Sequence, residues 1–138
     1  MTRLSLLAAV LLVTGAGIAD ADANRDAILA SFAAQAKQAD PAFAGFSAAA
    51  GKTFWTGTHS GGKPDTPSCT TCHTKDARAS GQTRAGKTID PMAVSANPQR
   101  FTDAAKVDKW LGRNCNTVAG RDCTAQEKGD IITYLSSL

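Results

Sequence analysis

Cys69-Thr70-Thr71-Cys72-His73 is the stretch that decides how the rest of this chain is interpreted. The C-x-x-C-H spacing is the attachment signature of c-type haem. Two cysteines three residues apart lie on one side of a helical turn, so both sulfurs can form thioethers with the haem vinyl groups. The next residue, a histidine, is carried beneath the ring, where an imidazole nitrogen binds iron. The motif predicts one covalently attached haem c, held by Cys69 and Cys72, with His73 as the proximal iron ligand.

Two other uses of a C-x-x-C pair fit the sequence less well. A thioredoxin-like redox pair follows a strand and opens a helix, and no strand pattern precedes Cys69. A structural zinc site needs four ligands, and the sequence contains no second C-x-x-C and no H-x-H. Haem attachment is therefore the favoured interpretation.

The first two dozen residues have the pattern of a secretory signal peptide. Arg3 supplies a positive start, and Leu4 to Ala16 is an apolar run too short to span a bilayer. Small residues then alternate with acids, which gives cleavage candidates after Ala21 and after Ala23. We expect residues 1–23 to be removed, leaving one domain of residues 24–138 with no membrane span. Since bacteria attach haem to this motif after export, we expect the protein in the periplasm.

Composition and periodicity predict an all-α fold. The formal net charge is +3, a mild basic bias that gives no nucleic-acid footprint. Few segments alternate with period two, whereas several show helical spacing. We expect five helices. The first is capped by Asn24, the second spans Ser47 to Trp55, and the third starts near Cys69. The fourth is capped by Thr102 or Asp103, and the fifth begins with a capping box at Thr124-Ala125-Gln126-Glu127. Residues 79–99 read as a long polar loop.

This order of helices resembles the small cytochrome c (class I-like) fold. In that fold an N-terminal helix with a glycine and an aromatic residue crosses a C-terminal helix with an aromatic residue. Gly51, with Phe54 or Trp55, and Tyr134 match those parts. The glycine is expected to permit close approach of the two helices.

Three residues are candidates for the distal iron ligand, opposite His73. Met92 follows a proline in the loop after the motif, and its thioether would make an ordinary electron carrier. His59 lies in a glycine-rich loop, where it can equally be a solvated side chain. Asn114 ends a helical stripe formed with Val107, Trp110 and Leu111. Its amide needs a partner, which is either a backbone carbonyl at a helix end or the iron.

A second cysteine pair stands next to the last of these candidates. Cys115 follows Asn114, and Cys123 precedes the capping-box threonine. In an oxidising compartment the two cysteines are expected to form a disulfide, which would join the end of one helix to the start of the next.

Four segments together resemble the sphaeroides haem protein family. They are Gly61 to His73, Asn97 to Asp103, Val107 to Asn116, and Gly120 to Thr124. The family consists of periplasmic monohaem cytochromes c. The resemblance implies that Asn114 is the distal ligand, that it leaves the reduced iron so that oxygen or nitric oxide binds, and that Cys115 and Cys123 form the family's disulfide. It also implies a dihaem cytochrome c as redox partner.

The leading hypothesis from the sequence is a cytochrome that combines electron transfer with reversible binding of small ligands. The main alternative is a simple electron carrier with His73 and Met92 as axial ligands. A third is a haem enzyme that scavenges a small molecule, although no distal acid–base pair is evident in the sequence to support it.

Overall fold

The computed structural model describes residues 16–138, and this part of the chain is almost entirely helical. Two very short strands interrupt the helices. The elements in chain order are α1 (Ala16–Ala39), α2 (Ala48–Thr56), α3 (Thr70–His73), β1 (Gly81–Gln82), β2 (Thr88–Ile89), α4 (Ala104–Ala119) and α5 (Ala125–Ser136). No described helix is long and apolar enough to cross a membrane. The all-α prediction is confirmed.

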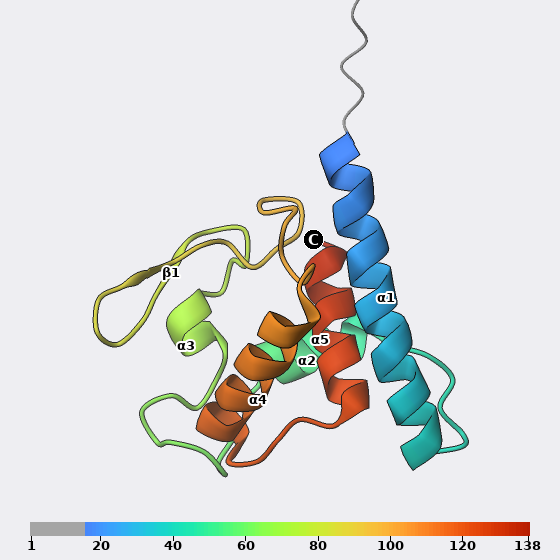
Figure 1. Cartoon of the computed structure of the whole chain (residues 1–138). Helices are drawn as coiled ribbons and strands as arrows, with labels where there is room; N and C mark the ends of the chain where they lie inside the picture. Colours follow the sequence, from blue (N-terminus) through green and yellow to red (C-terminus); the bar gives the residue numbers. More distant parts are fainter. Residues whose placement is uncertain (1–15) are drawn as a thin grey trace, which may run out of the picture.

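Helix α5 forms the centre of the fold. Figure 1 shows α5 between α1 on one side and α4 on the other, with α2 behind it. Ile131, Ile132 and Leu135 of α5 are the largest fully buried side chains. Burying such a side chain contributes roughly 1.5–3 kcal/mol. The packing of α1 and α2 against this helix, with α4 side chains in the same hydrophobic core, therefore sets the framework that carries the haem motif.

Helix α2 crosses α5 at a glycine, as the sequence predicts. Gly51 is buried, and a Cβ atom there would overlap the carbonyl oxygen of Asp130 and lie 2.9 Å from the Cβ of Tyr134. Since glycine carries no Cβ, the backbones of the two helices can approach at this point. Trp55 follows one turn later on α2 and is 3% exposed.

The helix starts agree with the sequence except at the N-terminus. The side chains of Ser47, Asp103 and Thr124 cap α2, α4 and α5, and Glu127 completes the capping box. In contrast, α1 begins at Ala16, so the predicted cap at Asn24 is wrong. Alanines recur along residues 16–23, and alanine is the strongest helix former, so the helix extends through them. Residues 1–15 of the predicted signal peptide lie outside the described residues.

The segment predicted as a polar loop contains a small hairpin. β1 and β2 pair antiparallel, with Gly81 opposite Ile89 and Gln82 opposite Thr88. A Cβ on Gly81 would overlap the carbonyl oxygen of Cys72, so the hairpin lies directly against the haem motif. An ion pair between Arg84 and Asp65 joins the hairpin to the loop that leads into the motif. Two-residue strands escape a period-two search because they show only one alternation.

Candidate haem site

The cysteine–histidine motif forms a single helical turn. Cys69 immediately precedes α3, and its carbonyl accepts hydrogen bonds from the amides of Cys72, at 3.3 Å, and His73, at 3.1 Å. Neither Cys69 nor Cys72 is in a disulfide, and both are partly exposed. Burial raises the pKa of the Cys69 thiol to about 11. The turn thus presents two unpaired thiols and an imidazole from consecutive positions of one backbone.

The His73 ring is held against Trp55. The two ring centroids are 5.1 Å apart and the planes are tilted by 34°. Burial, followed by the positive charge of Arg100, lowers the pKa of His73 to about 4, so its imidazole is neutral at pH 7. Its Nδ1 atom is buried with no hydrogen-bond partner among the described residues. A neutral imidazole is the form that binds a metal, so the arrangement suits an iron ligand.

Asn114 lies within the body of α4 and not at its end. The helix continues for five more residues to Ala119, so the helix-end role considered from the sequence does not apply. The Asn114 side chain is partly exposed, and no side-chain hydrogen bond is recorded for it among the described residues, whereas Asp108, Asn116 and Thr117 of the same helix make such bonds. Asparagine is a poor residue for a helix interior, so its presence there calls for another explanation.

The predicted apolar stripe of α4 is only partly correct. Val107 and Leu111 are buried, but Trp110 is 49% exposed. The buried stripe continues instead through Cys115 and Val118. Trp110 lies beside two cations, with Lys109 and Arg113 each 5.6 Å from its ring. The prediction failed for Trp110 because residues at i+3 and i+4 lie on opposite sides of residue i around the helix, so only Leu111 of this pair faces the core with Val107.

A disulfide joins Cys115 to Cys123, and their Cα atoms are 5.6 Å apart. This pair connects the helix of Asn114 to the residue before the α5 cap. A further link reaches the segment that leads into the haem motif, because the amide of Lys63 donates to the carbonyl of Thr117 at 2.8 Å. The region around Asn114 is therefore fastened both to α5 and to the chain that enters α3.

The other two candidates for the distal ligand have different surroundings. The amide of Met92 donates to the carbonyl of Ala77 at 2.9 Å, four residues beyond His73, and the Met92 side chain packs against the hydrophobic core. His59 stacks on Phe54 with ring centroids 4.5 Å apart, and its Nε2 lies 3.0 Å from the Phe54 carbonyl oxygen. The local contacts of His59 explain its position without an iron.

Two arginines support the segment around Met92, and neither was among the candidate residues identified from the sequence. Arg100 donates to the carbonyls of Pro91, at 2.8 Å, and Asp90, at 2.7 Å. Arg25 of α1 donates to the carbonyls of Pro98, at 2.7 Å, and Arg100, at 3.2 Å. The Arg25 contacts join residues that are 73 and 75 positions apart in the chain, so no local sequence pattern could reveal them.

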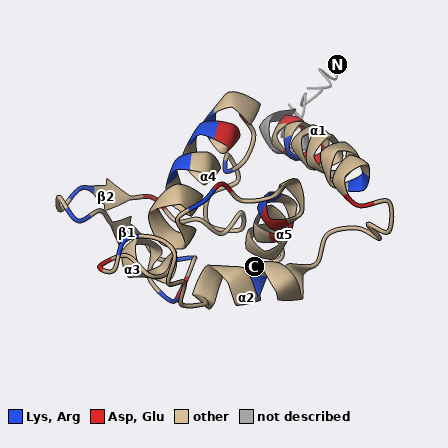
Figure 2. Ribbon diagram, turned by 90° about the horizontal axis from the view of Figure 1, so that it is seen from below, with Lys and Arg blue, Asp and Glu red and all other residues tan. Residues whose placement is uncertain are grey.

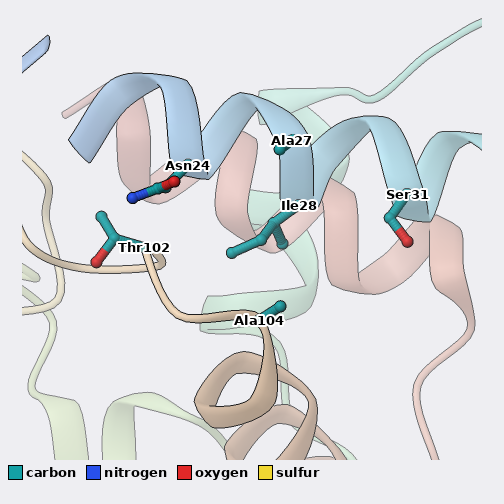
Figure 3. Close-up of a pocket in the computed structure, with 6 residues that line it drawn as sticks. All are labelled: Asn24, Ala27, Ile28, Ser31, Thr102 and Ala104. Atoms are coloured by element: carbon teal, nitrogen blue, oxygen red, sulfur yellow. The ribbon is translucent and has the colours of Figure 1, made fainter. Parts of the chain in front are cut away.

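Two surface pockets lie away from the motif. One, with a volume of about 330 Å³, lies between α1 and the start of α4. Figure 3 shows Asn24 and Ile28 of α1 on one side of it and Thr102 and Ala104 on the other. The second, of about 510 Å³, is next to His59. Neither includes a residue of the cysteine–histidine motif, so neither is a candidate for the haem site.

Comparisons with known proteins give one matching family model and c-type cytochromes as similar proteins. Residues 41–135 match the family model described as "Domain of unknown function (DUF1924)". The chain is 49% identical over 137 residues to cytochrome c-type protein SHP of Cereibacter sphaeroides, which covers 99% of both chains. It is 31% identical over 113 residues to cytochrome c'' of Methylophilus methylotrophus, covering 81% of this chain and 78% of the relative.

Solved structures of the same relatives match the fold. The structure described as oxidized SHP, an oxygen binding cytochrome c, has a TM-score of 0.76 and 50% identity, covering 83% of this chain and 96% of that one. The solution structure of Methylophilus methylotrophus cytochrome c'', described as giving insights into haem-ligand detachment, has a TM-score of 0.70 and 31% identity. It covers 84% of this chain and 94% of that one.

The fold and the motif, with two unpaired thiols and a neutral, partly buried imidazole, define a c-type cytochrome with covalently attached haem c. The chain belongs to the sphaeroides haem protein family, the family of SHP, and through residues 41–135 to DUF1924.

Proposed function

We propose that this cytochrome binds a small ligand such as oxygen or nitric oxide reversibly at its iron and also transfers electrons. Cys69 and Cys72 attach the haem, His73 is the proximal ligand, and Asn114 is a displaceable distal ligand. When bound, the haem supplies a redox-active iron with two axial positions.

The observation that carries this proposal is the position of Asn114. It is an internal residue of a well-capped helix, it lies beside the Cys115–Cys123 disulfide, and no helix-end carbonyl is available to explain it. An amide that is held in place by its helix and by a disulfide can leave a metal without disturbing the fold. The disulfide limits how far the side chain moves when it does so.

The chemistry of an amide oxygen fits a ligand that depends on oxidation state. An amide oxygen is a hard donor, which favours Fe(III) over the softer Fe(II). Reduction of a bound haem would therefore weaken the hold of Asn114 and would open the distal position. Trp110 lies one helical turn before Asn114, so its side chain is expected beside that opening.

The relatives support the same proposal. SHP is described as an oxygen binding cytochrome c, and the cytochrome c'' structure as bearing on haem-ligand detachment. We extend both properties to this chain, because the identity to SHP spans nearly the whole sequence.

The second candidate function is that of a plain electron carrier with Met92 as distal ligand. Its side chain is partly buried and lies in a segment fixed by hydrogen bonds, which would suit a permanent ligand. That segment, however, is tied to Ala77 and to Arg100, whose charge acts on His73. Both contacts favour placing Met92 on the side of His73 and leaving the opposite side to Asn114.

We further propose a periplasmic location after removal of residues 1–23, and a redox protein, a dihaem cytochrome c, as partner. In Figure 2 the ribbon carries the colour of Lys and Arg at positions along α4 and at the β1–β2 hairpin, and these cations would favour approach of an acidic surface. The α4 residues are Lys106, Lys109 and Arg113, and those at the hairpin are Arg84 and Lys87.

Ligand binding by the reduced protein tests the proposal. Carbon monoxide should bind the wild-type Fe(II) protein rapidly and shift its Soret band, and oxygen should bind reversibly. A reduced protein that stays low-spin and resists carbon monoxide would favour the plain electron carrier.

A further inference from the structure

Thr74, the residue after the motif histidine, has a backbone conformation that residues other than glycine rarely adopt. Its φ is 62° and its ψ is 171°. This combination belongs to a region of backbone space that is occupied almost only by glycine, because a Cβ atom is crowded there. The crowding is greatest for a β-branched residue such as threonine. Such a conformation persists only where the surrounding structure holds the residue in it.

The strain at Thr74 has no explanation in core packing. One other non-glycine residue of the described chain, Phe101, also has a φ of 62°. The Phe101 side chain is 9% exposed and belongs to the hydrophobic core, so its burial accounts for the backbone around it. The Thr74 side chain is exposed. Its conformation must therefore be held by bonds on either side of it along the chain.

The first of these bonds comes from the Thr74 side chain. Its hydroxyl donates to the carbonyl of Asp76 at 2.8 Å, two residues further on. Asp76 is itself fixed, because its carboxylate accepts the amide of Arg78 at 2.9 Å. Threonine hydroxyls stabilise turns through local bonds of this kind. The hydroxyl of Thr74 thus stabilises a backbone shape that the Cβ of the same residue disfavours.

The chain beyond this turn is fastened to the interior. Ala77 is 3% exposed, and its carbonyl accepts the amides of Met92 and Ala93, both at 2.9 Å. The amide of Val94 donates in turn to the carbonyl of Leu135 in α5 at 3.0 Å. The segment that leaves the haem motif is therefore tied to the central helix, and the end of the motif cannot relax by moving that segment outward.

The histidine of the motif is held from its other sides as well. The amide of His73 donates to the carbonyl of Cys69 at 3.1 Å, and its ring lies against Trp55, with centroids 5.1 Å apart. A Cβ at Gly81 would lie 2.9 Å from the His73 Cα, so the hairpin packs on the histidine backbone. His73 thus has fixed neighbours before it and beside it, and Thr74 sets the direction in which the chain leaves it.

We propose that Thr74 is a positioning residue for His73, and that its strained backbone, held by its hydroxyl, sets the orientation of the imidazole plane. The inference rests on the proposed role of His73 as proximal iron ligand. Residues that do not touch a metal orient its ligands through such contacts, and their loss changes the metal site. The hydroxyl is needed here only because the backbone is strained. Glycine adopts the same backbone without strain and needs no hydroxyl to keep it.

Proton NMR of the oxidised holoprotein with cyanide bound tests this inference. Cyanide makes the distal ligand the same in every variant, whichever residue binds there in wild type. The hyperfine-shifted signals of the haem methyl groups then report the orientation of the His73 ring plane. Thr74→Val keeps the shape and strain of threonine without the hydroxyl, Thr74→Ser keeps the hydroxyl, and Thr74→Gly removes both strain and hydroxyl.

Thr53→Val is the matched control. The Thr53 hydroxyl also donates to a backbone carbonyl, that of Ala49 at 3.0 Å, and the residue is exposed and lies within α2. The methyl signals of Thr74→Val should move away from those of wild type by more than the spread among Thr74→Ser, Thr74→Gly and Thr53→Val. If Thr74→Val does not mature, Thr74→Ala replaces it, because alanine has the same strain and no hydroxyl, and its signals should move likewise.

Three outcomes separate this inference from the proposal on which it rests. Wild-type methyl signals in Thr74→Val, or in the alanine variant that replaces it, overturn the inference alone. A shift of equal size in Thr74→Gly also overturns it, because the hydroxyl would then act without any strain to hold. Wild-type protein without hyperfine-shifted signals from the His73 ring overturns the proposed proximal ligand instead.

Discussion

Replacing Gly51 by alanine tests the contact that sets α2, and with it Trp55, against the rest of the molecule. A Cβ at this position would overlap the Asp130 carbonyl and lie 2.9 Å from the Cβ of Tyr134. These atoms belong to the backbone and the root of a side chain, so α2 must move away from α5. Overpacking of this kind costs about 3 kcal/mol at the upper end of its usual range. The better helix propensity of alanine returns about 1 kcal/mol.

The net prediction for Gly51→Ala is a loss of about 2 kcal/mol in the free energy of unfolding. For a domain of this size, that loss lowers the melting temperature by about 6–10 °C. Thermal unfolding of the holoprotein followed by far-UV circular dichroism measures the change. Gly112→Ala is the matched control, because Gly112 is also inside a helix and its nearest neighbour to an added Cβ, an Asp122 carboxylate oxygen, lies 3.5 Å away. Equal melting temperatures for the two variants would refute the reasoning.

Two further predictions concern the start of α5. Glu127→Gln should lower the free energy of unfolding by about 0.5–1 kcal/mol at pH 7. The hydrogen bond from Arg121 holds the pKa of Glu127 in the folded state below its usual value. The stabilisation by the Glu127 carboxylate is therefore complete above the unfolded-state pKa of about 4.3 and is lost as pH falls through the folded-state pKa. Urea unfolding at pH 7 and pH 3 should therefore show a variant that differs from wild type less at pH 3 than at pH 7. Replacing Cys115 and Cys123 together by serine opens a loop with a sequence separation of 8, which should cost about 2.5 kcal/mol; a urea midpoint equal to that of wild type would contradict this.

The sequence predicted those parts of the fold that depend on local chemistry. The capping box at Thr124 and the caps at Ser47 and Asp103 were predictable, because a capping side chain bonds to an amide two or three residues away. The Gly51–Tyr134 contact was predictable only through resemblance to the cytochrome c fold. The start of α1 was not, since a run of alanines continues a helix past a good cap residue.

The sequence was less informative about the surroundings of the site. The exposure of Trp110 depends on which side of the α4 axis faces α5, and helical spacing alone leaves that angle open by tens of degrees. The contacts of Arg25 join segments far apart in the chain, so no local motif contains them. The sequence was enough to single out Asn114 as a candidate ligand, whereas only the structure shows that it lies inside α4 and not at the helix end.

The central claim, that Asn114 is the displaceable distal ligand, is tested most directly by comparing Asn114→Ala with Met92→Leu in the oxidised state. In Asn114→Ala the absorption spectrum should change from that of six-coordinate iron to that of five-coordinate, high-spin iron. In Met92→Leu it should stay as in wild type. An oxidised spectrum that changes only in Met92→Leu, with Asn114→Ala unchanged, would contradict the assignment.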